Sequence, residues 1–161
     1  MSALNFDVVV LGGGPAGASG AAAAAVFGQR VALVEQAREV GGTGVMTGTL
    51  PSKTLRETAV ALSGVRARKL FGVDLSIRRE AKISDFTRHQ QQVSAGESER
   101  IANRLQTLGV ERFQGTASFV DAHTIRVTRS GAADLQLRGE KILIATGSSS
   151  FRPPGFSFED D

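Results

Sequence analysis

Three glycines near the start of the chain have the spacing of a phosphate-binding loop. Gly12, Gly14 and Gly17 form the pattern G-x-G-x-x-G between an apolar run and an alanine-rich segment. The first glycine permits a tight turn, the second lets the backbone approach a pyrophosphate, and the third lets a helix lie close to a sheet. Pro15 and Ala16 would lie in the first helical turn, where free N–H groups face the phosphates. The pattern predicts a dinucleotide site.

An acidic residue follows at the place where the adenosine ribose of such a ligand needs an acceptor. Glu35 ends the next apolar run. A carboxylate there accepts hydrogen bonds from ribose hydroxyls and repels a 2′-phosphate. Because strand, loop, helix and acid occur in the required order, we favour a ligand site over a glycine turn without a ligand. This unit fits NAD and FAD equally well.

The segments around the glycine loop predict a strand, a helix and a second strand. Residues 6–11 and 30–35 are short, nearly continuous apolar runs, as in strands buried on both faces of a parallel sheet. Residues 18–27 are rich in alanine, which suits a helix packed tightly on a sheet, and Gly28 is a suitable helix end. Together they form a βαβ unit, so we expect an α/β fold with a parallel sheet.

Two helices are expected in an excursion over about residues 51–109. After a glycine-rich loop over 36–51, a helix beginning near Pro51 is predicted by apolar residues at helical spacing: Leu55, Ala59, Leu62 and Val65. A longer helix is expected from a cap at Ser84-Asp85 to just before Gly109. One stripe of it carries Phe86, Val93, Ile101, Leu105 and Leu108, and its polar middle is expected to fray or bend.

Short strands are expected in the last third of the chain. Their predicted ranges are 110–119, 124–128, 135–137 and 141–146, and they add a small antiparallel β-meander to the parallel sheet. Residues 151–161 have no clear period and are expected to form a tail or linker after a domain over residues 1–150.

Composition excludes several kinds of function. The chain has no cysteine, which rules out disulfides and thiolate catalysis, and its two histidines, His89 and His123, are too far apart for a convincing metal site. The net charge is +3. We interpret the interrupted basic residues between Arg66 and Lys82 as a solvated surface, not a nucleic-acid site. No membrane span or signal peptide is evident, so we expect a cytoplasmic protein.

The segment after Glu35 distinguishes between the two dinucleotides. Residues 41–53 read GGTGVMTGTLPSK, which resembles the G-G-T-C-x-x-x-G-C-I-P-S-K signature of the pyridine nucleotide–disulfide oxidoreductases. Residues 115–119 (GTASF) resemble the family's G-x-A-x-F strand beside the adenine, and residues 145–148 (ATGS) resemble its segment beside the flavin. The resemblance implies the family's Rossmann-like FAD-binding domain, with FAD as the cofactor.

The resemblance also implies which residues contact the cofactor. Lys53 matches the family lysine near the flavin N5, where a cation would stabilise the reduced, anionic flavin. Thr49 is expected to fill space against the flavin, and no catalytic residue is assigned. The expected cofactor-binding residues are Gly12, Gly14, Pro15, Ala16, Gly17, Glu35, Gly42, Thr43, Thr49, Lys53, Gly115, Ala117, Ala145, Thr146 and Gly147.

The family's redox-active cysteine pair is replaced here by Gly44 and Thr49. Neither side chain can form a thiolate or a disulfide, so reduction of disulfides by the usual route is excluded. Hydride exchange between nicotinamide nucleotides through the flavin stays possible. The run from Thr49 to Arg56 most resembles the branch of the family that carries it out, the soluble pyridine nucleotide transhydrogenases.

Two further units of the family have no counterpart in the sequence. No second G-x-G-x-x-G pattern for NAD(P)H and no dimerisation domain follow Gly147, although full-length members are homodimers. We therefore expect a fragment of a hydride-transferring flavoprotein. The alternatives are a free-standing FAD-binding module of a split flavoprotein and, less favoured, an NAD-binding sensor domain.

Overall fold

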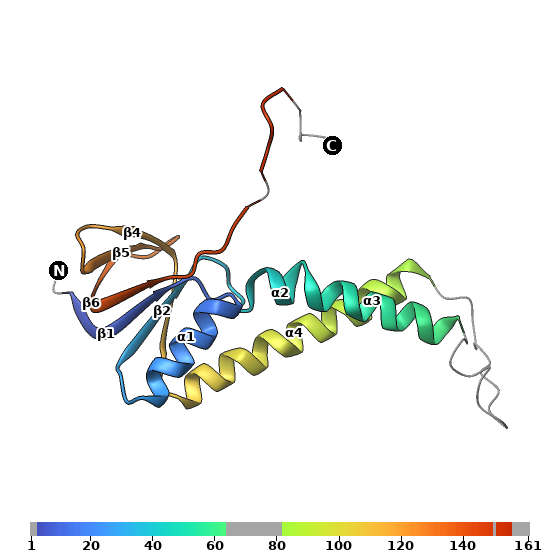
Figure 1. Ribbon diagram of the computed structural model, residues 1–161, viewed down its shortest axis with the longest axis horizontal. Coiled ribbons are helices and arrows are strands. Elements are labelled where there is room, and N and C mark those ends of the chain that lie inside the picture. The colour runs from blue at the N-terminus through green and yellow to red at the C-terminus, as the bar shows by residue number, and fades with distance from the viewer. Residues whose placement is uncertain (1–2, 64–81, 150, 156–161) are drawn as a thin grey trace.

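A computed structural model of the protein describes residues 3–63, 82–149 and 151–155 (Figure 1). The predicted basic residues from Arg66 to Arg79, the predicted helical residue Val65 and most of the predicted tail lie outside them. The described part is built on one six-stranded mixed sheet with the strand order β3-β2-β1-β6-β5-β4. The fold class is therefore α/β, as the sequence predicted.

The parallel half of the sheet carries the predicted βαβ unit. Strand β1 (Leu4–Leu11) pairs in parallel with β2 (Val31–Glu35), which pairs in parallel with β3 (Glu111–Gln114). Val9, Val10 and Leu33 are completely buried because both faces of these strands are covered. Helix α1 (Pro15–Val26) packs on one face through its small residues, which let its axis approach the sheet closely: Gly17, Ala18, Ala21 and Ala22.

The second half of the sheet corrects two strand predictions. The predicted strands at 135–137 and 141–146 are one strand, β6 (Leu135–Ile144), which pairs in parallel with β1 and in antiparallel with β5 (Thr124–Thr128). Gly139 lies within this strand: it pairs with Phe6 of β1, and its N–H donates to the His123 carbonyl at 2.9 Å.

The predicted strand over residues 110–119 is divided in two. Gly115 separates β3 from β4 (Thr116–Phe119), and β4 pairs in antiparallel with β5. The φ of Gly115 is +156°, and an added Cβ would lie 2.6 Å from the Thr128 carbonyl oxygen. The backbone therefore changes direction at Gly115, and the meander joins the parallel strands in the same sheet.

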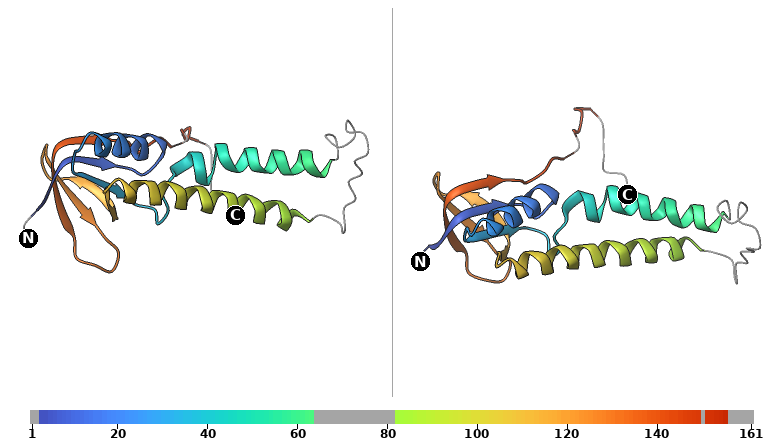
Figure 2. Two further views of the ribbon diagram at one scale, coloured as in Figure 1. Left: turned by 90° about the horizontal axis from the view of Figure 1, so that it is seen from below. Right: turned by 60° about the horizontal axis from the view of Figure 1, so that its bottom comes forward.

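Two apolar cores lie on opposite faces of the parallel strands. One contains Leu33 and Val10 from the sheet together with α1 and Leu105. The other contains Phe6 and Val9 together with the meander residues Ile125, Val127 and Leu137. Figures 1 and 2 show the resulting layers, with α1 on one side of the parallel strands and the meander on the other.

A helical arm extends from this body. It consists of the short α2 (Gly42–Met46), α3 (Thr49–Leu62) and the long α4 (Ile83–Thr107), and the views agree that α3 and α4 run side by side (Figures 1 and 2). The predicted loop over 36–51 thus contains a helical turn, and α3 begins two residues before Pro51. None of the described helices combines the length and the apolar character needed to cross a membrane.

The long helix differs from its prediction at its start and in its middle. Lys82, not Ser84, is the cap residue, and Asp85 in the first turn accepts the Lys82 N–H at 2.9 Å. The middle neither frays nor bends out of the helix, because Ser94 and Ser98 face inward and are 4% and 5% exposed. Their hydroxyls are hydrogen-bonded, which removes the cost of burying them.

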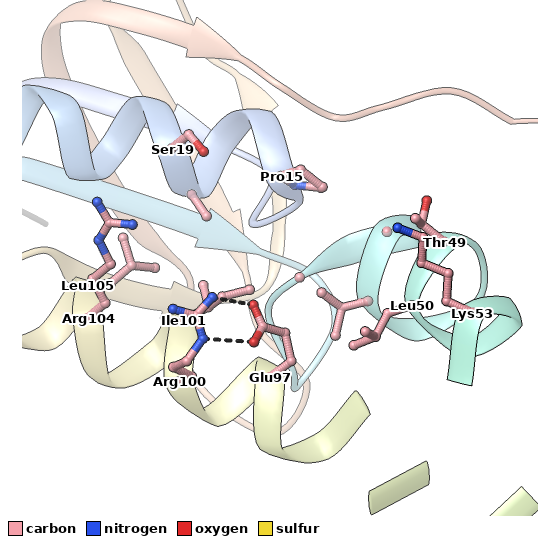
Figure 3. Close-up of a pocket in the computed structure, with 14 residues that line it drawn as sticks. Pro15, Ser19, Thr49, Leu50, Lys53, Glu97, Arg100, Ile101, Arg104 and Leu105 are labelled. Atoms are coloured by element: carbon pink, nitrogen blue, oxygen red, sulfur yellow. Dashed lines mark hydrogen bonds and ion pairs between the residues drawn. The ribbon is translucent and has the colours of Figure 1, made fainter. Parts of the chain in front are cut away.

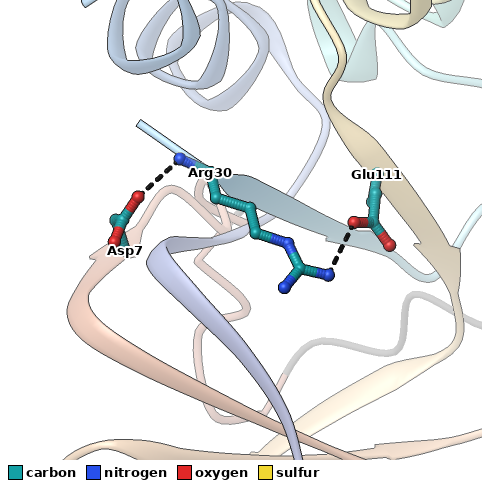
Figure 4. Close-up of polar contacts among 3 residues, drawn as sticks. All are labelled: Asp7, Arg30 and Glu111. Carbon is teal, nitrogen blue, oxygen red and sulfur yellow. Dashed lines mark hydrogen bonds and ion pairs between the residues drawn. The ribbon is translucent and has the colours of Figure 1, made fainter. Parts of the chain in front are cut away.

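Arg30 links the starts of the parallel strands (Figure 4). Its backbone N–H donates to Asp7 Oδ2 at 2.6 Å, and its guanidinium donates to Glu111 Oε1 at 3.1 Å and lies 4.7 Å from the centre of the Phe6 ring. Both members of the Arg30–Glu111 pair are about half exposed, so the pair itself contributes at most about 1 kcal/mol. The contacts align β1, β2 and β3 at the end of the sheet opposite the glycine loop.

Candidate functional site

The glycine loop turns sharply between β1 and α1. Gly12 has a φ of +102°, and an added Cβ would lie 2.4 Å from the Ala145 carbonyl oxygen. A Cβ on Gly17 would lie 1.8 Å from the Gly12 carbonyl oxygen, inside any permitted contact. The first turn of α1 lies directly against the loop and the end of β6, so neither position has room for a side chain. These are the turn and close-packing roles that the sequence predicted for Gly12 and Gly17.

A cleft of about 550 Å³ opens at the carboxyl ends of β1, β2 and β6, and we call it the carboxyl-edge cleft. Its volume suits a small-molecule ligand, and its place in the sheet is where α/β folds bind dinucleotides. The predicted site residues that line it are Gly12, Gly14, Pro15, Ala16, Glu35, Gly42, Thr43, Gly115, Ala117, Ala145, Thr146 and Gly147. Segments from four parts of the chain thus meet in one place.

The wall of this cleft is shaped for close approach by a ligand. A Cβ on Gly14 would meet no atom nearer than the Gly42 Cα at 3.8 Å, so the space in front of this residue is open. Gly42 has a φ of +52°, and a Cβ there would lie 2.8 Å from the Gly14 Cα. Gly14 also caps α1, whose first N–H groups have no partner within the helix. The cleft therefore offers N–H donors and bare backbone, which suit a pyrophosphate.

Glu35 lines the carboxyl-edge cleft at the end of β2, and its carboxylate is already oriented. Gly13 donates its N–H to Oε2 at 2.5 Å, and Ala37 donates its N–H to Oε1 at 2.9 Å. An ionised carboxylate has about four acceptor positions, so both oxygens keep capacity for ribose hydroxyls. The side chain is thus a fixed acceptor that needs little rearrangement to hold a ribose.

A second cleft, of about 600 Å³, lies between α1, α3 and α4, and we call it the helix cleft (Figure 3). The structure places Thr49 and Lys53 here, outside the carboxyl-edge cleft, together with Gly44. Pro15 lines both clefts, so the start of α1 forms the wall between them. The predicted cofactor-binding residues are therefore divided: twelve share the first cleft, Gly17 lies beneath the loop, and two face the second.

Charged side chains from α4 line the helix cleft. Glu97 accepts two hydrogen bonds from the Arg100 guanidinium, at 2.8 and 2.6 Å, and Figure 3 shows both. This contact holds the pKa of the Glu97 carboxyl below its ordinary value. Arg104 and Lys53 add two positive charges to the same lining. With three cations and one acid, of which Arg100 and Glu97 form a pair, the charged groups of the helix cleft have a net positive charge.

Gly44 occupies the first of the two cysteine positions of the family signature, and its surroundings are tight. An added Cβ would lie 3.1 Å from Pro15 Cγ, close enough to require that ring to shift by a few tenths of an ångström. The helix cleft therefore contains no thiol at this position, and a side chain there would press on the Pro15 ring.

Sequence reasoning missed several residues of the carboxyl-edge cleft. Among them are Gln36 and Glu39 in the loop after β2, and Met46 and Thr47 at the end of α2. Met46 and Thr47 fall on variable positions of the family signature, so the motif itself gave no reason to select them. Their only sequence signal is that they lie within the glycine-rich segment.

The structure gives no sign of a metal centre in the ranges it describes. No group of three or more histidines, cysteines or acids close enough to hold a metal ion occurs there. His123 Nδ1 lies 3.1 Å from the Gly139 carbonyl oxygen, so this nitrogen donates and the ring serves the turn before β5. His89 lies in a shallow groove between α3 and α4.

Comparison with known proteins gives one consistent family. The model of the pyridine nucleotide-disulphide oxidoreductase family matches residues 6–160. The soluble pyridine nucleotide transhydrogenase of Mycobacterium bovis (strain BCG / Pasteur 1173P2) is 37% identical over 158 residues, which are 98% of this chain and 34% of that protein. The enzyme of the same name from Pseudomonas aeruginosa (strain LESB58) is 34% identical, with 98% of this chain and 34% of that protein covered.

Solved structures give the same result. The HOCl-induced flavoprotein disulfide reductase RclA from Escherichia coli, in a Cu(II) complex, superposes with a TM-score of 0.76 at 28% sequence identity. The match covers 96% of this chain and 31% of that one. The chain thus spans about a third of the length of the curated and solved relatives that it matches.

Proposed function

The chain belongs to the pyridine nucleotide-disulphide oxidoreductase family, and we propose that it is the FAD-binding part of a flavoprotein that transfers hydride from, or between, nicotinamide nucleotides. The cofactor is FAD, as the sequence motifs predicted. The observation that carries the proposal is the carboxyl-edge cleft. In it the glycine loop, the ribose acid and the two downstream motifs of the FAD domain converge.

The residues of this cleft fit FAD in extended form across the edge of the sheet. The N–H groups at the start of α1 would hold the pyrophosphate, and Glu35 would accept the hydroxyls of the adenosine ribose. The backbone near Gly115 and Ala117 would border the adenine, and Ala145 to Gly147 would lie toward the flavin. When bound, FAD supplies a ring that accepts and returns hydride. The protein's part is to bind and orient it.

The composition of the chain limits which electron acceptor it serves. With no cysteine in the sequence, the residues of this chain cannot exchange a disulfide with a substrate. Hydride exchange needs no such pair. The names of the transhydrogenase relatives support this reaction. Because Pro15 borders both clefts, Lys53 and Thr49 would reach a flavin that extends past Pro15 toward the helix cleft, Lys53 by its positive charge and Thr49 by filling the space beside the ring.

The remaining functions would belong to other parts of a longer protein. We propose that NAD(P)H binds through a second nucleotide-binding unit and that the whole protein is a homodimer, as the family resemblance implies. We also propose a cytoplasmic location, which agrees with the word "soluble" in the names of its relatives. Residues 1–150 would form the FAD domain.

The test is whether the purified chain takes up FAD. We expect a visible flavin absorption band that survives gel filtration after incubation with FAD, and no comparable retention of NAD. Glu35→Ala should weaken FAD retention, because it removes both the ribose acceptor and the carboxylate to which the Gly13 N–H of the glycine loop donates. A chain that stays colourless after incubation with FAD, yet is folded by circular dichroism, would refute the proposal.

A second measurement addresses the nicotinamide nucleotides. The FAD-loaded chain should not be bleached rapidly by NADPH or NADH, although dithionite should reduce it fully. Rapid bleaching by either nucleotide would show that the chain itself contains a nicotinamide site, which contradicts the assignment of that function to another unit.

A further inference from the structure

A buried serine on the helical arm is tied to the loop that follows the ribose acid. Ser98 lies on α4 and is 5% exposed, and its hydroxyl donates to the Val40 carbonyl oxygen at 2.7 Å. The two residues are 58 positions apart in the sequence. This is a tertiary contact between the arm and the loop from Gln36 to Gly41. A helical serine often donates to a carbonyl of its own helix, but the Ser98 hydroxyl donates to this loop instead.

Val40 and its neighbour hold the glycine loop in turn. Val40 is 2% exposed, and a Cβ added to Gly13 would lie 3.0 Å from Val40 Cγ1. The Gly41 N–H donates to the Gly13 carbonyl oxygen at 2.8 Å. The backbone of Gly13 is therefore held at its carbonyl from the side of the loop that Ser98 anchors.

Gly13 then orients the carboxylate of Glu35. Its N–H is one of the two backbone donors to this side chain, and the Ala37 N–H, from the same anchored loop, is the other. A Cβ on Gly13 would lie 3.1 Å from Glu35 Oε2, so the carboxylate packs directly on this peptide. Gly13 is thus linked to Val40 and Gly41 by direct contact, Ala37 lies earlier in the same loop, and Ser98 holds Val40.

We propose that Ser98 is a positioning residue for the adenosine ribose of FAD, acting through Val40 and Gly13 on Glu35. This role rests on the proposed function, because it takes Glu35 as the acceptor of the ribose hydroxyls. A hydrogen bond to a carboxylate weakens steeply with misalignment. Loss of the anchor would loosen the loop, and Glu35 would then have to be ordered again each time the cofactor binds.

The experiment compares Ser98→Ala with Ser94→Ala. Ser94 is the matched control, because it lies one turn earlier on the same buried face of α4 and its hydroxyl accepts a hydrogen bond from Gln90 on the same helix, at 3.1 Å. Each variant is titrated with FAD and with the FAD analogue whose adenosine carries 2′-deoxyribose. We expect Ser98→Ala to bind FAD about fivefold more weakly, the equivalent of one buried hydrogen bond.

The analogue separates positioning from general loss of structure. Because it lacks one hydroxyl for Glu35, the loss caused by Ser98→Ala should shrink to about twofold or less with it. Ser98→Thr, which keeps the hydroxyl, should bind FAD nearly as the unmodified chain does. In the absence of any cofactor, the Gly13 and Ala37 amide protons should exchange faster in Ser98→Ala, and not in Ser94→Ala.

The outcomes distinguish this role from the proposed function. Equal losses for FAD and the deoxy analogue, or unchanged exchange at Gly13 and Ala37, would overturn the role of Ser98 and leave FAD binding intact. An unmodified chain that binds neither ligand would overturn the proposed function and, with it, the assignment of Ser98 to ribose binding. If Ser98→Ala does not fold, the same titrations on Ser98→Thr and Ser98→Val, which differ only in the hydroxyl, decide the matter.

Discussion

Replacement of Gly17 by alanine tests how closely α1 must approach the glycine loop. The new Cβ would lie 1.8 Å from the Gly12 carbonyl oxygen and 3.0 Å from its carbon. These are backbone atoms, so no side-chain rotation relieves the overlap. Even a close carbon–oxygen contact needs about 3.3 Å, so α1 and the loop must separate by about 1.5 Å.

Two opposing terms set the size of the effect. Overpacking in a well-packed region costs about 1–3 kcal/mol, and the rigid neighbours place Gly17→Ala at the upper end. Replacing a helical glycine by alanine returns about 1 kcal/mol. The net loss is about 2 kcal/mol, which lowers the Tm by about 4–8 °C in a chain of this size. Displaced N–H groups should also weaken FAD binding at least about tenfold.

The control is the same substitution in α4. A Cβ on Gly96 meets no atom within 4 Å. Gly96→Ala should therefore raise the Tm by about 2–4 °C through helix propensity alone and leave FAD binding unchanged. Thermal unfolding followed by circular dichroism and titration with FAD measure both effects. If Gly17→Ala were as stable as the unmodified chain and bound FAD equally well, the close approach of α1 would not be a requirement of the site.

Three further substitutions test other parts of the structure. Leu105→Ala removes a side chain that is 1% exposed beneath α1 and should cost about 2–5 kcal/mol in urea unfolding; a loss below about 1 kcal/mol would contradict its place in the core. Gly28→Ala should cost about 1 kcal/mol by the same measurement, because its φ is +77° and no atom crowds it, so only backbone strain contributes; a stabilised variant would contradict this. The N–H of His123 and the hydroxyl of Thr124 lower the pKa of the Asp121 carboxyl. The ionised Asp121 should therefore stabilise the fold at neutral pH, and this stabilisation should be lost as the pH falls through the lowered pKa. The Tm of Asp121→Asn should lie below that of the unmodified chain at neutral pH and meet it only in acid. A Tm difference that stays constant at all pH values would refute this prediction.

The predictions that succeeded depend on short-range signals. The turn at Gly12 and the close packing at Gly17 follow from backbone sterics within one loop, so their spacing was enough to predict both. The strand around Val9 and Val10 was predictable because a continuous apolar run of that length is typical of a doubly covered strand.

The features that were missed depend on distant partners. The strands predicted at 135–137 and 141–146 are one strand because Gly139, which lies between them, pairs with Phe6 of β1 and donates its N–H to the His123 carbonyl. The placement of Thr49 and Lys53 in the helix cleft depends on how α3 lies against α4 and on where α1 begins, which no local pattern reports. The burial of Ser98 is invisible for the same reason, since its partner Val40 precedes it by 58 residues.

The pairing of β1 with β6 has a consequence for how the chain folds. Leu11, at the end of the first strand, is paired with Ile144, so nearly the whole chain must be closed into a loop before the centre of the sheet exists. Closing so long a loop makes folding slow, and β1 cannot gain its second neighbour until β6 has been synthesised. Until then the apolar β1 offers an unpaired edge, which is a site for aggregation. Dilution, chaperones or early FAD should therefore raise the yield of refolded protein.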